Sequence, residues 1–330
     1  MRTFVLNYST IMKSNFRLLV ILLGLVQVGF SQDIDQSQST DIILEEKTPD
    51  EGQIKVEEKV FQTFKDTRVI NSPSVETLRA GKLDFRIGHR FGDAAGDAGG
   101  WPTFYGLEEA EDVLIGFDYG VTNNLMVGIN RAKGSGPLRQ NVNGSFKIRI
   151  IQQEINGNQP FSLALYGLAS YSTMEKSLRE DDLNFFAKEQ HRLAYHLQMM
   201  LSRKFSPYFS LQVGGGWTYR NIVPFNDVND LVHLSLASRI QMTKSLGIVL
   251  DAVVPFGNLR NSTDEVTGER TFYPAMGIGL EWETGGGHTF QMNFTNSTGM
   301  METDYIPYTT SNWLDGEFRF GFTISRLFTI

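Results

Sequence analysis

The chain has no cysteine among its 330 residues. Disulfides, thiolate metal sites, a catalytic cysteine and an N-terminal lipidated cysteine are therefore excluded. Its five histidines are scattered without the spacing of metal ligands, so we predict no metal site and no cofactor. The formal net charge is only −7, with both signs interspersed along the chain, which argues against a nucleic-acid-binding surface.

Long hydrophobic runs are also missing, with one exception at residues 18–30. This run follows two basic residues and ends in small residues, which is typical of a secretory signal peptide. We therefore expect residues 1–31 to be removed after export through the Sec pathway. Met12 is better placed than Met1 as the initiating residue. A transmembrane anchor is the alternative, but the run is shorter than the ~20 residues that a helical span needs.

The segment after the signal is poor in apolar residues. Residues 32–59 are rich in Gln, Ser, Asp and Glu, and such a composition cannot bury enough surface to order itself. Residues 61–78 carry more apolar side chains, and we expect them to pack against the domain that begins near residue 80. We therefore predict a flexible periplasmic extension over residues 32–79, with a partial plug as one role for its second half.

Glycine and phenylalanine are abundant, with 32 and 24 copies. From residue 80 onward, apolar residues alternate with polar or small ones. In residues 83–91, for example, Leu, Phe, Ile, His and Phe alternate with Asp, Arg, Gly and Arg. This period of two indicates β-strands with one apolar and one polar face. We predict an all-β domain of about twelve strands over residues 80–330.

Strand length and connection length favour a transmembrane barrel over a soluble sheet. Most predicted strands are about ten residues or longer, whereas strands in soluble proteins cluster near ~5–6 residues and membrane strands need ~9–11. Short and long connections alternate, as in outer-membrane barrels. The prediction is a transmembrane antiparallel up-and-down β-barrel in the outer membrane, with both chain ends in the periplasm. A soluble sandwich or lipocalin-like barrel is the alternative.

The polar face of the predicted strands carries charges of both signs. In a membrane barrel the apolar face contacts lipid, so this polar face lines the lumen. Unpaired buried charges are costly, and twelve strands enclose less space than the ~16–18 strands of wide porins. We therefore expect a mostly occluded, salt-bridged lumen with at most a narrow pore. The predicted lumen-lining residues are Asp84, Arg86, Arg90, Asp118, Lys147, Arg149, Arg239, Asp251, Glu281, Glu317 and Arg319.

Four of these charges lie on the first and last predicted strands, which must meet where the barrel closes. Opposite charges on adjacent strands contribute roughly 0.2–1 kcal/mol per pair. We predict that they form one cluster at the seam. Residues 108–112, which are rich in Glu and Asp, are expected instead to form a solvated acidic rim or a short helix near the lumen mouth. The seam residues are Asp84, Arg86, Glu317 and Arg319.

Several segments resemble one family of barrels. The matching stretches are residues 63–71 (TFKDTRVIN), 83–92 (LDFRIGHRFG), 116–122 (GFDYGVT) and 127–131 (VGINR). They look like a family of outer-membrane β-barrels from Bacteroidota-type bacteria, labelled domain of unknown function 5777. The resemblance covers about residues 60–330 and implies the fold and the location. It brings no ligand and no catalytic residues.

One pair of residues raises the question of an enzyme. His233 and Ser235 resemble the His-x-Ser element of outer-membrane phospholipase A, and such a pair can act in nucleophilic catalysis. Both lie on the predicted polar face, whereas lipid hydrolysis needs them at the lipid side. A lipid hydrolase is therefore only the third interpretation.

The preferred interpretation is a monomeric, non-enzymatic barrel that passes or binds a small solute through a narrow polar lumen. The second is a structural or surface-interaction barrel without transport. The expected partners are outer-membrane lipid and the barrel assembly machinery, because the last strand, residues 317–328, is aromatic on one face like the signal that this machinery reads. The sequence names no solute.

Overall fold

The computed structural model describes residues 59–330, except for residues 226, 258–259, 261–269 and 285. The predicted signal peptide and the first part of the predicted extension lie outside the described residues and stay predictions. Within the described ranges, no helix is long and apolar enough to cross a membrane.

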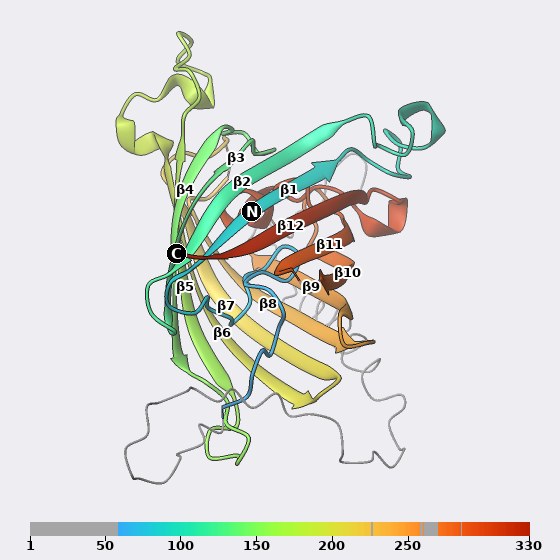
Figure 1. Cartoon of the computed structure of the whole chain (residues 1–330). Coiled ribbons are helices and arrows are strands. Elements are labelled where there is room, and N and C mark those ends of the chain that lie inside the picture. Colours follow the sequence, from blue (N-terminus) through green and yellow to red (C-terminus); the bar gives the residue numbers. More distant parts are fainter. Residues whose placement is uncertain (1–58, 226, 258–259, 261–269, 285) are drawn as a thin grey trace, which may run out of the picture. The chain divides into compact units, whose positions relative to one another are not determined.

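Twelve antiparallel strands in the described part of the chain form one closed barrel (Figure 1). Each strand pairs with its neighbours in sequence, and β1 pairs with β12 to close the sheet. The predicted twelve-stranded up-and-down barrel is confirmed. The strands are β1 (Lys82–Phe91), β2 (Ala110–Gly120), β3 (Leu125–Ala132), β4 (Asn141–Ile151), β5 (Ser162–Ser172), β6 (Leu193–Ser206), β7 (Phe209–Arg220), β8 (Asp230–Gln241), β9 (Leu246–Phe256), β10 (Ala275–Thr284), β11 (His288–Thr295) and β12 (Arg319–Thr329).

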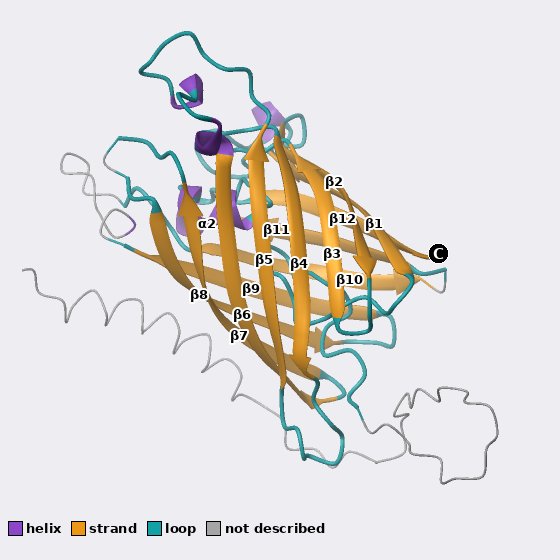
Figure 2. Ribbon diagram, turned by 90° about the vertical axis from the view of Figure 1, so that its left-hand side faces the viewer, coloured by secondary structure: helices purple, strands orange, loops and turns teal. Residues whose placement is uncertain are grey.

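The connections alternate between short turns and long loops, as predicted. Residues 207–208 make the short turn between β6 and β7, whereas residues 296–318 link β11 to β12. Helices lie in the long loops and gather toward one end of the barrel (Figure 2). They are η1 (Trp101–Thr103), η2 (Leu183–Phe185), η3 (Glu189–Arg192), α2 (Glu302–Tyr308) and η5 (Trp313–Asp315).

The two faces of the sheet have opposite character. Side chains on the outer face are apolar and exposed, as with Ile129 at 59% and Leu280 at 42%. Side chains on the inner face are polar and buried, among them Asp84, Arg86 and Lys147. This arrangement is inverted relative to a soluble barrel. It suits a lipid surround, where a closed sheet satisfies every backbone hydrogen-bonding group internally.

Two chain segments fill the lumen. The N-terminal segment, residues 59–79, precedes β1 and begins with the bridge between Lys59 and Glu154 at the short-turn end (Figure 1, blue). The β11–β12 loop, residues 296–318, folds inward and carries α2. Apolar side chains of both segments share one buried cluster, which includes Phe64, Val69, Met300 and Met301. The centre of the barrel is therefore packed chain and not an open pore.

Candidate functional site

The two inward segments meet at a buried ion pair. Arg68 of the N-terminal segment lies with its Nη2 2.5 Å from Oε1 of Glu302, at the start of α2. Glu302 is fully buried, and its Oε2 lies 3.4 Å from the hydroxyl of Tyr166 on β5. Arg68 also donates a 2.5 Å hydrogen bond to the Asn71 carbonyl, which fixes the local turn. This contact joins the two segments that block the lumen.

The tip of the N-terminal segment is a hairpin that donates several hydrogen bonds to one carboxylate of the wall. Val69 N donates to Ser72 O at 2.8 Å, which closes the turn. The turn points its amides at Asp251 on β9, whose Oδ2 accepts from Asn71 N at 2.6 Å and Ser72 N at 2.8 Å. The Asn71 side chain adds a 2.9 Å bond to Oδ1 of the same carboxylate. Converging amide donors stabilise a buried carboxylate that would otherwise be costly.

A second anchor pairs opposite charges between wall and segment. Arg86 on β1 forms a two-pronged contact with Asp66 of the N-terminal segment, with Nη1 2.8 Å from Oδ2. Its Nη2 also lies 2.9 Å from Oδ2 of Asp84 on the same strand. All three side chains are buried. Arg86 thus binds one carboxylate of the wall and one carboxylate of the segment, and its ion pair with Asp66 holds the segment against β1.

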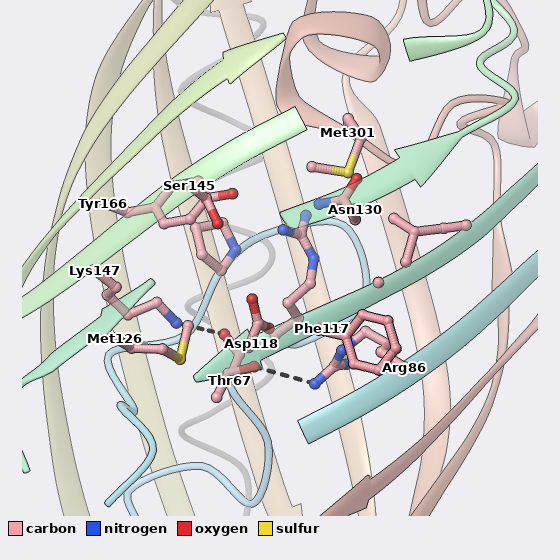
Figure 3. Close-up of a pocket in the computed structure, with 14 residues that line it drawn as sticks. Thr67, Arg86, Phe117, Asp118, Met126, Asn130, Ser145, Lys147, Tyr166 and Met301 are labelled. Atoms are coloured by element: carbon pink, nitrogen blue, oxygen red, sulfur yellow. Dashed lines mark hydrogen bonds between the residues drawn. The ribbon is translucent and has the colours of Figure 1, made fainter. Parts of the chain in front are cut away.

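Lys147 on β4 completes this part of the wall. Its Nζ donates to Thr67 O at 2.7 Å and to Glu76 O at 3.0 Å. We call Asp66, Asp84, Arg86, Asp118 and Lys147 the charged cluster. Figure 3 shows Asp118 beside a cavity between Lys147 and Arg86. The cavity measures about 30 Å³, which is room for roughly one or two waters.

The other predicted lumen charges also bind polar partners. Arg90 donates to Oδ1 of Asn71 and to Oγ of Ser297, both at 2.6 Å. Arg149 lies 3.5 Å from Glu76 of the N-terminal segment. Arg239 on β8 pairs with Glu281 on β10 at 2.8 Å. Each of these charged side chains therefore has a polar partner on the wall or on one of the inward segments.

The predicted seam cluster of Asp84, Arg86, Glu317 and Arg319 is wrong. The first and last strands do meet, but they run antiparallel, so Arg86 lies opposite Ser325. Arg319 sits at the far end of the seam and donates to Asn296 O at 2.6 Å. Glu317 precedes β12 and accepts from Asn312 N at 2.6 Å. The antiparallel register therefore separates Asp84 and Arg86 from Glu317 and Arg319.

The predicted acidic rim is also wrong for one residue. Glu108 and Glu109 are exposed, but Asp112 is completely buried on β2. Its carboxylate accepts from Gly134 N at 2.8 Å and from Met300 N at 2.9 Å, which anchors the β11–β12 loop to the wall. The sequence does contain a signal that this loop is buried. Met, Tyr and Ile residues surround Glu302, and such an apolar run is unusual in a solvated loop.

Asp304 of α2 lies near this anchor. Its Oδ2 accepts from Ser135 N at 2.8 Å. Burial, together with the nearby charge of Asp112, raises the pKa of Asp304 to about 7. The attachment of α2 therefore contains a group whose charge changes near neutral pH.

Asp227 shows the opposite behaviour in the β7–β8 loop. Burial alone would raise the pKa of Asp227, but hydrogen bonds and charges from Arg220 and Arg260 outweigh it and hold the pKa below its ordinary value. Arg220 also donates to the Tyr308 hydroxyl at 2.7 Å, so this pair holds the end of α2.

His233 and Ser235 do not form a nucleophilic pair. Both are buried on the inner face of β8, and the Ser235 hydroxyl accepts from Nε2 of Gln198 at 2.9 Å. The His233 ring stacks on His196 with centroids 5.2 Å apart. His196 in turn contacts the Thr218 hydroxyl at 2.9 Å. We call these five residues the neutral cluster. Among the described residues, no group of three or more His, Asp or Glu side chains could hold a metal ion.

No curated protein matches the chain, whereas the solved structures that match it include two porins and an outer membrane channel. The NanC porin is 9% identical with a TM-score of 0.45, over 75% of this chain and 99% of that chain. The KdgM porin is 6% identical with a TM-score of 0.43, over 76% and 99%. The COG4313 outer membrane channel from Pseudomonas putida F1 is 13% identical with a TM-score of 0.44, over 77% and 98%. At such similarity no ligand or role is transferred.

One family covers most of the chain. Residues 64–328 match the family described as a membrane bound beta barrel domain, DUF5777. The match includes every strand except the last residue of β12, and most of the N-terminal segment, and it confirms the resemblance seen in the sequence. It agrees with an outer-membrane type of barrel, while the bacterial group that the resemblance implied stays a prediction. The chain therefore belongs to the DUF5777 family of membrane-bound β-barrel domains.

Proposed function

We propose that the protein is a gated, non-enzymatic outer-membrane channel for small polar solutes. One observation carries the proposal: two chain segments close the lumen, and the wall side chains alone do not. In an eight-stranded barrel, side chains suffice to fill the interior. Here the wall leaves room for the N-terminal segment and the β11–β12 loop. Movement of either segment would open a polar path.

The test is conductance of the refolded full chain in planar bilayers. The wild type should give rare, small openings, because both segments occupy the lumen. A weakened variant replaces Asp66, Arg68, Asn71 and Glu76 by alanine, which removes side-chain anchors of the segment and leaves the wall intact. We expect this variant to open frequently. Equal, negligible conductance of both folded proteins would reject the channel.

A surface-interaction barrel is the second candidate. Large apolar side chains are exposed in three long loops: Trp101 at 73%, Leu178 at 97% and Leu314 at 92%. In the first of these loops, Phe104 and Tyr105 are exposed beside Trp101, and a contiguous exposed apolar patch is a feature of interaction surfaces. If adhesion or partner binding is the role, polar substitutions at these loop tips should abolish it without changing conductance.

Export and membrane surroundings form the last part of the proposal. We propose Sec-dependent export with removal of residues 1–31, insertion by the barrel assembly machinery, and a monomer in outer-membrane lipid. The expected result is recovery in the outer-membrane fraction with Gln32 at the N-terminus. Recovery as a soluble periplasmic species would contradict it.

A further inference from the structure

The lumen wall binds the main chain of the N-terminal segment. Gln212 on β7 accepts from Val75 N through Oε1 at 2.8 Å and donates to Pro73 O through Nε2 at 2.8 Å. A single buried amide thus pairs with one donor and one acceptor of the segment's backbone. This contact does not depend on the side chains of the bound residues.

Other wall side chains repeat this mode of contact. Lys147 donates to two carbonyls of the segment, and Gln291 on β11 donates to Val69 O. Asp251 accepts from backbone amides at the hairpin tip. The donors and acceptors therefore come from four strands and converge on the peptide groups of residues 67–76. Together they match the alternating C=O and N–H groups of a polypeptide.

Two arginines select acidic side chains near the ends of this stretch. Arg86 binds the Asp66 carboxylate, and Arg149 lies 3.5 Å from the Glu76 carboxylate. The bidentate contact between Arg86 and Asp66 gives geometric specificity as well as energy. An uncharged sugar offers no carboxylate to either arginine, whereas a peptide with two acidic residues satisfies both arginines and the backbone-binding groups.

We propose that the lumen wall is a binding site for acidic peptides that fold into a hairpin, and that the N-terminal segment is its resident ligand. The inference rests on the proposed channel function and names its substrate class. A peptide from outside would compete with the resident segment for Gln212, Lys147 and Asp251, and displacement of the segment would couple binding to opening.

The first experiment measures binding without any current. A fluorescent synthetic peptide of residues 64–76 is titrated into the refolded full-length weakened variant in detergent, and anisotropy is recorded. The peptide retains the anchors that the resident segment has lost, so it should displace that segment. The wild type should bind about tenfold more weakly or worse, because its tethered segment competes at high effective concentration. Equal weak binding to both proteins would overturn the proposal.

Two altered peptides separate recognition of backbone from recognition of charge. One carries N-methyl groups on the amides of Asn71, Ser72 and Val75, and the other carries lysine in place of Asp66 and Glu76. We expect each to bind at least about tenfold more weakly, since each loses two or more hydrogen bonds or ion pairs. Undiminished binding of the methylated peptide, or equal competition by a neutral oligosaccharide, would reject a peptide site.

Matched wall variants locate the site. In the weakened background, Gln212→Leu should reduce peptide affinity about tenfold, because two hydrogen bonds are lost. Gln198→Leu is the control, since Gln198 is an equally buried inner-face amide whose bonds go to the neutral cluster. Its effect on peptide affinity should be small. Equal losses from both variants would place the binding elsewhere.

Conductance of the same samples distinguishes this inference from the channel proposal. Peptide binding without current in any folded variant would reject the channel and keep the site. Current without discrimination among the peptides would keep the channel and reject the site. Folding is checked by heat-modifiable gel mobility. If the fourfold variant does not fold, the single substitution Asn71→Ala replaces it, and failure of the peptide to bind that folded variant better than the wild type rejects the site.

Discussion

Buried polar side chains find their hydrogen-bond partners in different ways in two parts of the lumen wall. The charged cluster around Arg86 uses an acid of the N-terminal segment as a partner, and Lys147 donates to two carbonyls of that segment. The neutral cluster around Gln198 bonds wall to wall, through Ser235 and the neighbouring histidines. The hydrogen bonds of the neutral side thus run within the sheet, whereas Arg86 and Lys147 on the charged side also bind a removable segment.

The difference shows where the segment is held. A buried polar group needs a hydrogen bond, and a buried charge needs a partner as well. The amide and imidazole side chains of β6 and β8 bond to one another across the intervening strand β7. Arg86 on β1 binds Asp84 of its own strand and also Asp66 of the segment, and Lys147 on β4 donates to two carbonyls of the segment. The segment is therefore held at these two strands.

The largest effect is expected from breaking the charged cluster. Arg86→Met leaves Asp66 and Asp84 buried without their shared cation, which should lower the free energy of unfolding by about 3–5 kcal/mol. It should also loosen the segment and raise conductance. Urea titration and bilayer recordings measure both results. Arg86→Lys keeps the charge but loses the two-pronged contact, so its free energy of unfolding should fall between those of Arg86→Met and the wild type. If Arg86→Met changes neither stability nor conductance, the charged cluster does not depend on the segment.

The next effect tests whether both clusters face away from lipid. Leu280→Arg puts a charge on the outer face of β10 and should cost about 2–4 kcal/mol near the bilayer midplane. Leu178→Arg is the matched control, because this leucine lies in a loop and is 97% exposed. Unfolding of liposome-inserted protein gives the comparison. Equal tolerance at both positions would contradict the assigned orientation.

A smaller loss is expected in the neutral cluster. Gln198→Leu deprives the Ser235 hydroxyl of its donor and the two histidines of an acceptor, at a cost of about 1–3 kcal/mol. Conductance should not change, because no bond to the N-terminal segment is lost. The same urea and bilayer measurements apply, and an opening of the channel by this variant would show that the two sides are not independent.

The smallest effect needs no change in the wall. Folded Asp304 holds its proton up to a pKa of about 7, against 3.8 for the ordinary group. The folded state therefore binds the extra proton between these values. The associated stabilisation is full below pH 3.8 and is lost as the pH rises through 7, which amounts to about 1 kcal/mol between pH 6 and 8. Thermal unfolding in this range checks it, and Asp304→Asn should remove the dependence.

The sequence predicts the sheet much better than the contents of its lumen. Alternation places Asp84 and Arg86 on one face and Leu83 and Phe85 on the other, because strand geometry repeats every two residues. The partners of these charges depend on register and on distant segments. Adjacency of the first and last strands predicts Arg319 beside Arg86, but antiparallel pairing puts Arg86 opposite Ser325, in the middle of the shared edge, and Arg319 beyond the Arg90 end of it.

No repeating pattern in the sequence predicts the contacts that the inward segments make. Glu302 and Asp112 read as loop acids, and only folding of the β11–β12 loop into the barrel buries them. The apolar residues of 61–78 do predict packing against the barrel. Which wall groups they meet depends on hairpin geometry at residues 69–72, and no pattern in the sequence encodes that pairing.

The ion pair between Arg68 and Glu302 also bears on the order of folding events. It joins residues separated by 234 positions, one shortly before β1 and the other shortly before β12. These two strands are the two ends of the sheet in chain order, and joining them closes a very long loop at an entropic cost. A contact made ahead of both strands shortens the remaining search. Early pairing of Arg68 and Glu302 should therefore speed barrel closure, so that the same contact that blocks the lumen helps to build its wall.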